Sequence, residues 1–153
     1  MFGTITGKKI GILGFSFKAN TNDTRESAAI QICKDLLEEG AEIVIHDPKV
    51  NPNQIEIDLN LHPRSKILEN SNHKSNNDGS WDFAYSIKSS LKDADAVLIL
   101  TEWSEYLTIE WQEMYKIMRK PAWIFDSRSI IDPKQIKTTG LNLWRVGCLL
   151  YTS

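Results

Sequence analysis

Two short apolar runs separated by a segment of helical periodicity constrain this chain more than any other feature of its sequence. The first run, residues 8–13, reads KKIGIL and stops at a glycine, as a buried strand of a parallel sheet does. From Thr24 to Gly40 apolar residues recur at helical spacing, which predicts a helix capped by Asp23 or Thr24 and ended by the glycine. The second run, residues 41–46, reads AEIVIH. Strand, helix and strand in this order predict a β-α-β unit, whose crossover is right-handed in about 98% of cases.

The same alternation returns after residue 80. In chain order the patterns predict a helix over residues 82–92, a strand over 94–100, a helix over 105–118, a strand over 121–125, a short helix over 132–138 and a strand over 142–146. Between the two regular parts, residues 49–80 are polar, and we predict an irregular insertion that is partly mobile over residues 60–80. Strands alternating with helices indicate a Rossmann-like α/β fold: an open, doubly wound, mainly parallel sheet of about five or six strands in three α/β/α layers.

Composition and charge exclude several classes of function. The chain has 153 residues, 41% hydrophobic and 25% charged, which suits one globular domain with its own core. The net charge is -2 with mixed signs, so no basic block indicates nucleic acid or a membrane surface as a partner. No apolar run approaches the roughly 20 residues of a membrane span, and we predict a cytoplasmic protein. Cys33 and Cys148 make neither a disulfide framework nor a metal site, and Cys33 is expected to be a buried small hydrophobe.

Cationic and polar side chains follow three of the predicted strands at the point where each strand ends. Lys18 follows the first strand, with Arg25 further along the same loop, Thr101-Glu102-Trp103 follows another, and Arg128 follows a third. In open α/β sheets, ligands bind outside the carboxyl ends of the strands. Arginine can hold a phosphate or carboxylate with two parallel hydrogen bonds, and lysine acts as a point charge. The edge is therefore predicted to bind a phosphorylated, acidic small molecule.

Each of these cations also has a purely structural interpretation, which the sequence leaves open. Lys18 could be a solvated loop lysine, and Arg25 could pair with Asp23 or Glu26. Arg128 could cap a helix.

A complete, independent site for a dinucleotide is not indicated. The first turn has Gly11 and Gly14 but then Phe15, so the G-x-G-x-x-G fingerprint is absent. Asp47 ends the second strand, where an acidic residue would hold a ribose, but Asp-Pro also starts turns and we favour that interpretation.

Five motifs carry a resemblance to a known family. GFSFK, DTRES, HDPKV, TEW and KPAWIFDSR occur in this order, and together they span residues 1 to about 147. On these motifs the chain resembles the UDP-glucose 6-dehydrogenase family. DTRES followed by TEW favours UDP-glucose over the GDP-mannose and UDP-N-acetylmannosamine enzymes of the wider group.

The resemblance implies that cofactor binding, dimerisation and substrate binding belong to different domains of the full enzyme. The family oxidises UDP-glucose to UDP-glucuronate with two NAD, through a thiohemiacetal and a thioester on a catalytic cysteine. It has an N-terminal NAD-binding domain, a central helical domain used for dimerisation, and a C-terminal domain that completes the UDP-sugar pocket. Residues 1–147 resemble only the last of these. The resemblance therefore implies an enzyme fragment that is inactive alone, with NAD bound mainly by the missing N-terminal domain and with a homo-oligomeric full enzyme.

The resemblance also assigns roles to individual residues. It implies that Phe17 and Lys18 contact the sugar nucleotide, that Arg128 reaches its phosphate or sugar, and that Arg25 approaches NAD. The catalytic cysteine belongs to a segment before this domain, so no catalytic residue is expected here. Ser127 stands where the family usually has glycine, beside Arg128.

The last residues, 148–153, depart from the family pattern, and we expect them to be a non-native tail. Two alternatives to the enzyme fragment stay open. One is a stand-alone nucleotide-binding or regulatory module, and the other is a domain kept for assembly whose pocket is vestigial. A domain of a related GDP-mannose or UDP-N-acetylmannosamine dehydrogenase is the alternative within the family.

Overall fold

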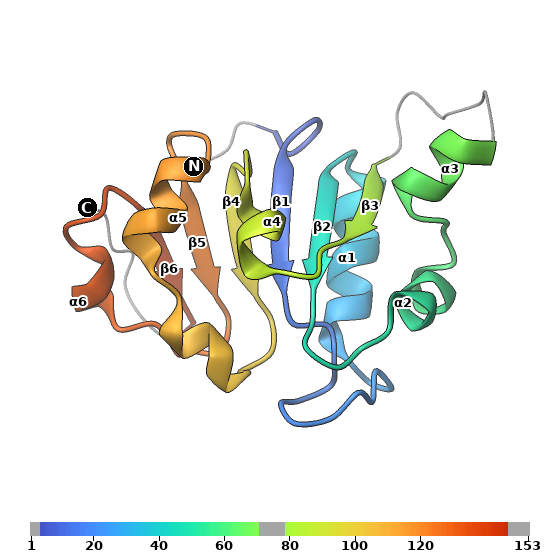
Figure 1. Cartoon of the computed structure of the whole chain (residues 1–153), viewed down its shortest axis with the longest axis horizontal. Coiled ribbons are helices and arrows are strands. Elements are labelled where there is room, and N and C mark those ends of the chain that lie inside the picture. The colour runs from blue at the N-terminus through green and yellow to red at the C-terminus, as the bar shows by residue number, and fades with distance from the viewer. Residues whose placement is uncertain (1–3, 71–78, 147–153) are drawn as a thin grey trace.

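A six-stranded parallel sheet forms the middle of the molecule (Figure 1). The computed structural model describes residues 4–70 and 79–146. The strands are β1 (Lys9–Leu13), β2 (Glu42–His46), β3 (Ser80–Phe83), β4 (Ala96–Ile99), β5 (Trp123–Asp126) and β6 (Asn142–Arg145). They lie in the order β3-β2-β1-β4-β5-β6, and each neighbouring pair is parallel. This is the doubly wound order, whose switch point lies between β1 and β4. The predicted fold class is confirmed.

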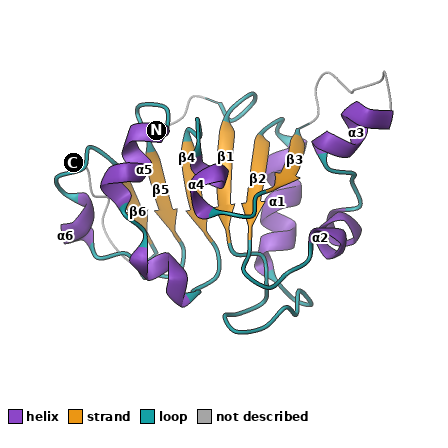
Figure 2. Cartoon of the chain, in the orientation of Figure 1, coloured by secondary structure: helices purple, strands orange, loops and turns teal. Residues whose placement is uncertain are grey.

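Helices cover both faces of the sheet. They are α1 (Ala28–Glu38), α2 (Pro52–Leu59), α3 (Arg64–Asn70), α4 (Ile87–Leu91), the 3-10 helix η1 (Ser104–Thr108), α5 (Trp111–Ile117) and α6 (Pro133–Ile136). Figure 2 shows α1 behind the sheet and α4 and α5 in front of it. The apolar side chains accordingly form two cores, one shared with α1 and α2 and the other with α4, α5 and α6.

Successive side chains of β1 point to opposite faces of the sheet, so β1 contributes to both cores. Ile10 and Ile12 belong to the core under α1, whereas Leu13 belongs to the core under α5. Cys33 of α1 is fully buried in the first core, and burial raises the pKa of its thiol. The prediction that Cys33 is a buried small hydrophobe is confirmed.

Helix α1 begins later than predicted. Its N-cap is Ser27, whose hydroxyl accepts a hydrogen bond from the Ala29 amide at 3.2 Å and donates one to the Phe15 carbonyl at 2.8 Å. The expected cap at Asp23 or Thr24 is therefore wrong, because these residues belong to the loop that returns from β1. Gly40, with φ of 87°, follows the helix as expected.

The expected irregular insertion over residues 49–80 is wrong for most of its described part. Helix α2 begins at Pro52 after Asn51, whose side chain accepts from the Asn53 amide at 2.7 Å. Asparagine at the cap and proline at the first position are a favourable helix start. Ile55 and Leu59 of this helix are buried in the core under α1.

A strand and a short helix replace the helix predicted over residues 82–92. Strand β3 pairs with β2, with Trp81 opposite Ile43, and Trp81 is 1% exposed. Its Nε1 donates to the Leu61 carbonyl at 2.8 Å. Helix α4 then occupies only Ile87–Leu91. The helix predicted over residues 105–118 is likewise divided, into η1 and α5.

Candidate functional site

The loops that follow β1, β4 and β5 lie at one edge of the sheet, the lower edge in Figure 1. These loops carry the cations that the sequence singled out. Because β4 lies between β1 and β5, and neighbouring strands are about 4.8 Å apart, the ends of β1 and β5 are about 10 Å apart. A diphosphate with an attached sugar can span that distance.

The turn after β1 is held by the carboxylate of Asp47. Its Oδ2 accepts hydrogen bonds from the amides of Phe15 at 2.8 Å and Ser16 at 3.0 Å. The same oxygen accepts a bond from Nε1 of Trp103 at 3.3 Å. Asp47 therefore ties together the ends of β1, β2 and β4.

The other oxygen of Asp47 shapes its own turn. Oδ1 accepts from the amides of Lys49 at 2.8 Å and Val50 at 2.9 Å. With both oxygens engaged by the backbone and the side chain 4% exposed, Asp47 is not available to a ribose. The structure supports the turn interpretation of Asp47.

A second set of contacts joins the Lys18 segment to the end of β4. The Thr101 hydroxyl donates to the Ser16 carbonyl at 3.0 Å, and the Ser16 hydroxyl donates to the Lys18 carbonyl at 2.8 Å. Phe17 is 42% exposed, and Lys18 is exposed beside it. The backbone of this segment is therefore fixed while both side chains are open to solvent.

Arg128 stands on a turn that is built by Asp126. The fully buried carboxylate of Asp126 accepts from the amides of Arg128 at 3.0 Å and Ile131 at 2.7 Å. Nε of Arg128 donates to the Leu100 carbonyl at 2.9 Å, which holds the side chain at the end of β4. Arg128 does not cap α6, whose cap is Asp132.

Serine is accommodated at the position beside Arg128. The Ser127 hydroxyl donates to the Ile99 carbonyl at 2.6 Å, and the Ser127 amide donates to the same oxygen at 3.2 Å. The Ser127 side chain thus adds a hydrogen bond between the turn after β5 and strand β4, and it does not displace the turn.

Arg25 lies on the loop between β1 and α1 and has an internal partner. Its Nε donates to Oδ1 of Asp23 at 3.0 Å and its Nη2 to Oδ2 at 2.9 Å. The Arg25 side chain is 89% exposed. Arg25 thus pairs with Asp23, which is one of the alternatives that the sequence left open. An anionic ligand would have to compete with the Asp23 carboxylate for the Arg25 guanidinium.

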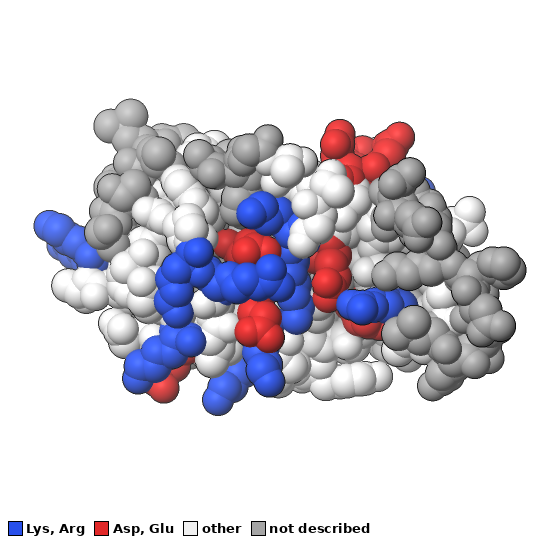
Figure 3. All heavy atoms as spheres, turned by 90° about the horizontal axis from the view of Figure 1, so that it is seen from above, with Lys and Arg blue, Asp and Glu red and all other residues white. Residues whose placement is uncertain are grey.

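Positive charge is not confined to this edge. Figure 3 looks onto the opposite, amino edge of the sheet, where Lys and Arg side chains also gather. There, Arg119 approaches Asp95 at 3.7 Å, and Lys116 pairs with Glu113 at 2.9 Å in the last turn of α5. Cations near helix C-termini are favoured by the helix dipole. Lys116 and Arg119 therefore have anionic partners, whereas no ion pair of Lys18 or Arg128 is found in the described part of the chain.

Comparison with known proteins identifies the domain. Residues 11–133 match the UDP binding domain of the UDP-glucose/GDP-mannose dehydrogenase family. The chain belongs to this family. The resemblance inferred from the five motifs is confirmed.

Curated members of the family are similar to nearly the whole of this chain. It is 39% identical over 153 residues to UDP-glucose 6-dehydrogenase 2 of Oryza sativa subsp. japonica, covering 96% of this chain and 31% of the relative. It is 41% identical over 147 residues to UDP-glucose 6-dehydrogenase of Drosophila melanogaster, covering 96% of this chain and 30% of the relative. The chain therefore spans about a third of the length of the curated relatives it matches.

Solved structures show that the fold is shared. The NDP-N-acetyl-D-galactosaminuronic acid dehydrogenase of Methanosarcina mazei Go1 superposes with a TM-score of 0.70 at 21% identity, covering 94% of this chain and 25% of that one. The UDP-glucose dehydrogenase of Pyrobaculum islandicum does so with a TM-score of 0.60 at 23% identity, covering 87% of this chain and 24% of that one.

Sequence reasoning missed the groups that position the cations of this UDP-binding domain. Neither Asp126 nor Ser16 was assigned a role from the sequence alone. An acidic residue directly after a buried strand was the available signal, because such a residue often accepts hydrogen bonds from the backbone of the following turn.

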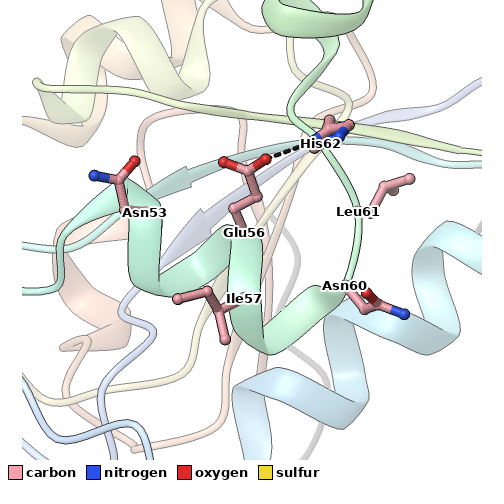
Figure 4. Close-up of a pocket in the computed structure, with 6 residues that line it drawn as sticks. All are labelled: Asn53, Glu56, Ile57, Asn60, Leu61 and His62. Atoms are coloured by element: carbon pink, nitrogen blue, oxygen red, sulfur yellow. Dashed lines mark hydrogen bonds and ion pairs between the residues drawn. The ribbon is translucent and has the colours of Figure 1, made fainter.

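A hollow of about 510 Å³ lies beside α2 (Figure 4). It is lined by Asn53, Glu56, Ile57, Asn60, Leu61 and His62. The Glu56 carboxylate pairs with His62 and with the Lys66 ammonium, the latter at 3.1 Å. The hydrogen bond from His62 is the main cause that lowers the Glu56 pKa. None of its lining residues is among the predicted site residues.

In the described ranges no helix is long and apolar enough to cross a membrane, and no cluster of three His, Cys, Asp or Glu residues could hold a metal ion.

The pairing of Arg25 with Asp23 predicts an acid titration. Side-chain and backbone hydrogen bonds from Arg25 lower the Asp23 pKa from its ordinary 3.8 to about 2. Because the folded-state pKa is depressed, any stabilisation from the pair is present above pH 3.8 and is lost as the pH falls through about 2.

A carbon-13 NMR titration of the Asp23 carboxyl should give this low pKa, and Arg25→Ala should return it towards 3.8. Arg25→Lys, which keeps the charge but loses the paired hydrogen bonds, should give an intermediate value. Titration of Asp23 near 3.8 in the unsubstituted chain would contradict the geometry.

Proposed function

We propose that this chain binds a UDP-sugar across the ends of β1, β4 and β5, as the UDP-binding part of a UDP-glucose 6-dehydrogenase. The full enzyme would oxidise UDP-glucose to UDP-glucuronate with two NAD. The observation that carries the proposal is that Lys18 and Arg128 lie on two different turns at one edge of the sheet. Hydrogen bonds connect each turn to the end of β4.

The chemistry of the edge suits a diphosphate. The Lys18 ammonium offers a point charge, and the terminal nitrogens of Arg128 offer a planar pair of donors whose orientation is set by the bond from Nε to Leu100. The exposed ring of Phe17 offers an apolar face to a sugar or base. The N-terminus of α1 lies at the same edge, where the helix dipole adds partial positive charge.

Oxidation would need groups from elsewhere. Cys33 is the one cysteine among the described residues, and its burial and raised pKa exclude it as a thiolate nucleophile. The turn after β1 lacks the glycine fingerprint and Asp47 is engaged by the backbone, so we propose that NAD is bound mainly by another domain, with Arg25 approaching it. In this proposal the full enzyme is a cytoplasmic homo-oligomer, and the UDP-binding domain supplies affinity rather than the reacting groups.

Calorimetry with UDP, UDP-glucose and GDP-mannose tests the proposal. We expect UDP and UDP-glucose to bind better than GDP-mannose, and Lys18→Ala and Arg128→Ala each to weaken UDP by about tenfold or more, because each removes a charged hydrogen-bond donor. Arg128→Lys should recover only part of the loss.

Lys92→Ala is the matched control, since Lys92 is an exposed lysine at the opposite edge, before β4. It should leave UDP affinity within about twofold, the range of a remote surface substitution. A preference for GDP-mannose, or UDP binding that neither site substitution weakens, would contradict the proposal.

A further inference from the structure

A hollow of about 410 Å³ opens at the carboxyl ends of β2 and β3, on the same edge of the sheet as Lys18 and Arg128 but at a different part of it. Its lining includes His46, Lys49, Phe83, Tyr85 and Glu105. Its volume falls within the range of small-molecule sites. None of the predicted substrate or cofactor residues lines it.

Aromatic and proline rings form the walls of the hollow. Tyr85 is 83% exposed, and its ring meets the Phe83 ring edge to face, with centroids 4.9 Å apart. Pro48 and Pro52 also line it. A phenol ring that is held by a neighbouring ring but open to solvent offers a flat surface for stacking.

His46 contributes a hydrogen-bond acceptor. Its Nδ1 lies 3.0 Å from the Tyr106 hydroxyl, which donates to the His46 carbonyl at 3.2 Å. A hydroxyl has one proton, so in the tautomer in which that proton goes to the carbonyl, Nδ1 carries a hydrogen and donates to the hydroxyl. Nε2 then keeps its lone pair, and within the described residues it has no partner. Burial lowers the pKa of His46, which favours this neutral form.

Two opposite charges complete the lining. Glu105 supplies a carboxylate and Lys49 an ammonium, and both side chains are exposed. Neither has an ion-pair partner in the described ranges. The hollow thus offers acceptors for N–H donors and, separately, a cation for a phosphate.

We propose that this hollow is a second nucleotide site, which takes a nucleoside monophosphate with an amino-bearing base, of the adenosine monophosphate class. The base stacks on Tyr85, its exocyclic amine donates to Glu105 or to Nε2 of His46, and its phosphate meets Lys49. Uracil fits worse, because its two carbonyl oxygens would face acceptors. In doubly wound sheets the end of the second strand is where the adenosine side of a dinucleotide lies. Asp47 is engaged by the backbone here, so the ribose is not held in the usual way.

Titration of the chain with adenosine monophosphate, followed by amide NMR and calorimetry, tests this site. Shifts should centre on the amides of Lys49, Asn51 and Tyr85. Tyr85→Ala should weaken binding by about tenfold, the range found for removal of a base-stacking aromatic ring. Lys49→Ala should weaken adenosine monophosphate but not adenosine, and uridine monophosphate should not produce these shifts.

Control variants separate this site from the proposed UDP site. Lys18→Ala and Arg128→Ala should leave the affinity for adenosine monophosphate within about twofold, and Tyr85→Ala should leave that for UDP equally unchanged. Absence of saturable binding at millimolar adenosine monophosphate, or binding lost with Lys18→Ala and kept with Tyr85→Ala, overturns the inference. Because the UDP titration is run on the same variants, failure of one site is distinguishable from failure of the other.

Discussion

Replacement of Asp47 by alanine is expected to lower the free energy of unfolding by about 3–5 kcal/mol, because buried donors would lose a charged acceptor. The Asp47 carboxylate accepts five hydrogen bonds, four from backbone amides and one from Trp103. Alanine provides no acceptor, and the residue is too buried for water to replace one without rearrangement. Urea unfolding followed by circular dichroism measures the loss.

Asp132→Ala provides the matched control. Asp132 makes one comparable bond, from its Oδ1 to the Lys134 amide at 3.0 Å, on an exposed helix start. Its loss should cost about 1 kcal/mol, as for an ordinary N-cap. If Asp47→Ala costs no more than Asp132→Ala, the carboxylate does not hold the turns together as described.

Gly14→Ala is expected to be comparably damaging, at about 3–5 kcal/mol, for a steric reason. Gly14 has φ of 97°, and a Cβ there would lie 2.4 Å from Cβ and 2.7 Å from the backbone nitrogen of Thr101. Relief of this clash requires the ends of β1 and β4 to separate. UDP affinity should fall with stability, because the Ser16 and Lys18 contacts depend on this approach.

Gly7→Ala separates the clash from backbone strain. Gly7 also has a positive φ, 77°, but a Cβ added there would meet no atom within 4 Å. The same substitution at this position should cost about 1 kcal/mol, from the left-handed backbone alone. Equal losses at the two glycines would show that contact with Thr101 is not what constrains Gly14.

The sheet was predictable because buried parallel strands carry their own signal. Runs such as Ala96–Ile99 and Trp123–Asp126 are short and largely apolar, since both faces are covered. Strand β3 escaped prediction because it lies at an edge and reads SWDF, which alternates polar and aromatic residues over only four positions. Helix α2 escaped because Asn51-Pro52, a good helix start, also suits a loop.

The edge at which the proposed cations gather could be predicted from the sequence, but the groups that support them could not. Parallel strands all end at one edge, so side chains that follow them must gather there, as Lys18 and Arg128 do. The supports are bonds to backbone atoms of distant segments. Asp47 binds an amide 32 residues before it, and Thr101 a carbonyl 85 residues before it. No local pattern records such partners, because any backbone group is an equally good candidate.

The support of the first turn by later strands has a consequence for biosynthesis. The loop that bears Lys18 leaves the ribosome first, 32 residues ahead of the carboxylate and 85 ahead of the hydroxyl that give it shape. Domains generally fold as units during translation. A nascent chain therefore gives the Lys18 loop its shape only once Thr101 has emerged, and Arg128, the other proposed phosphate contact, is synthesised later still.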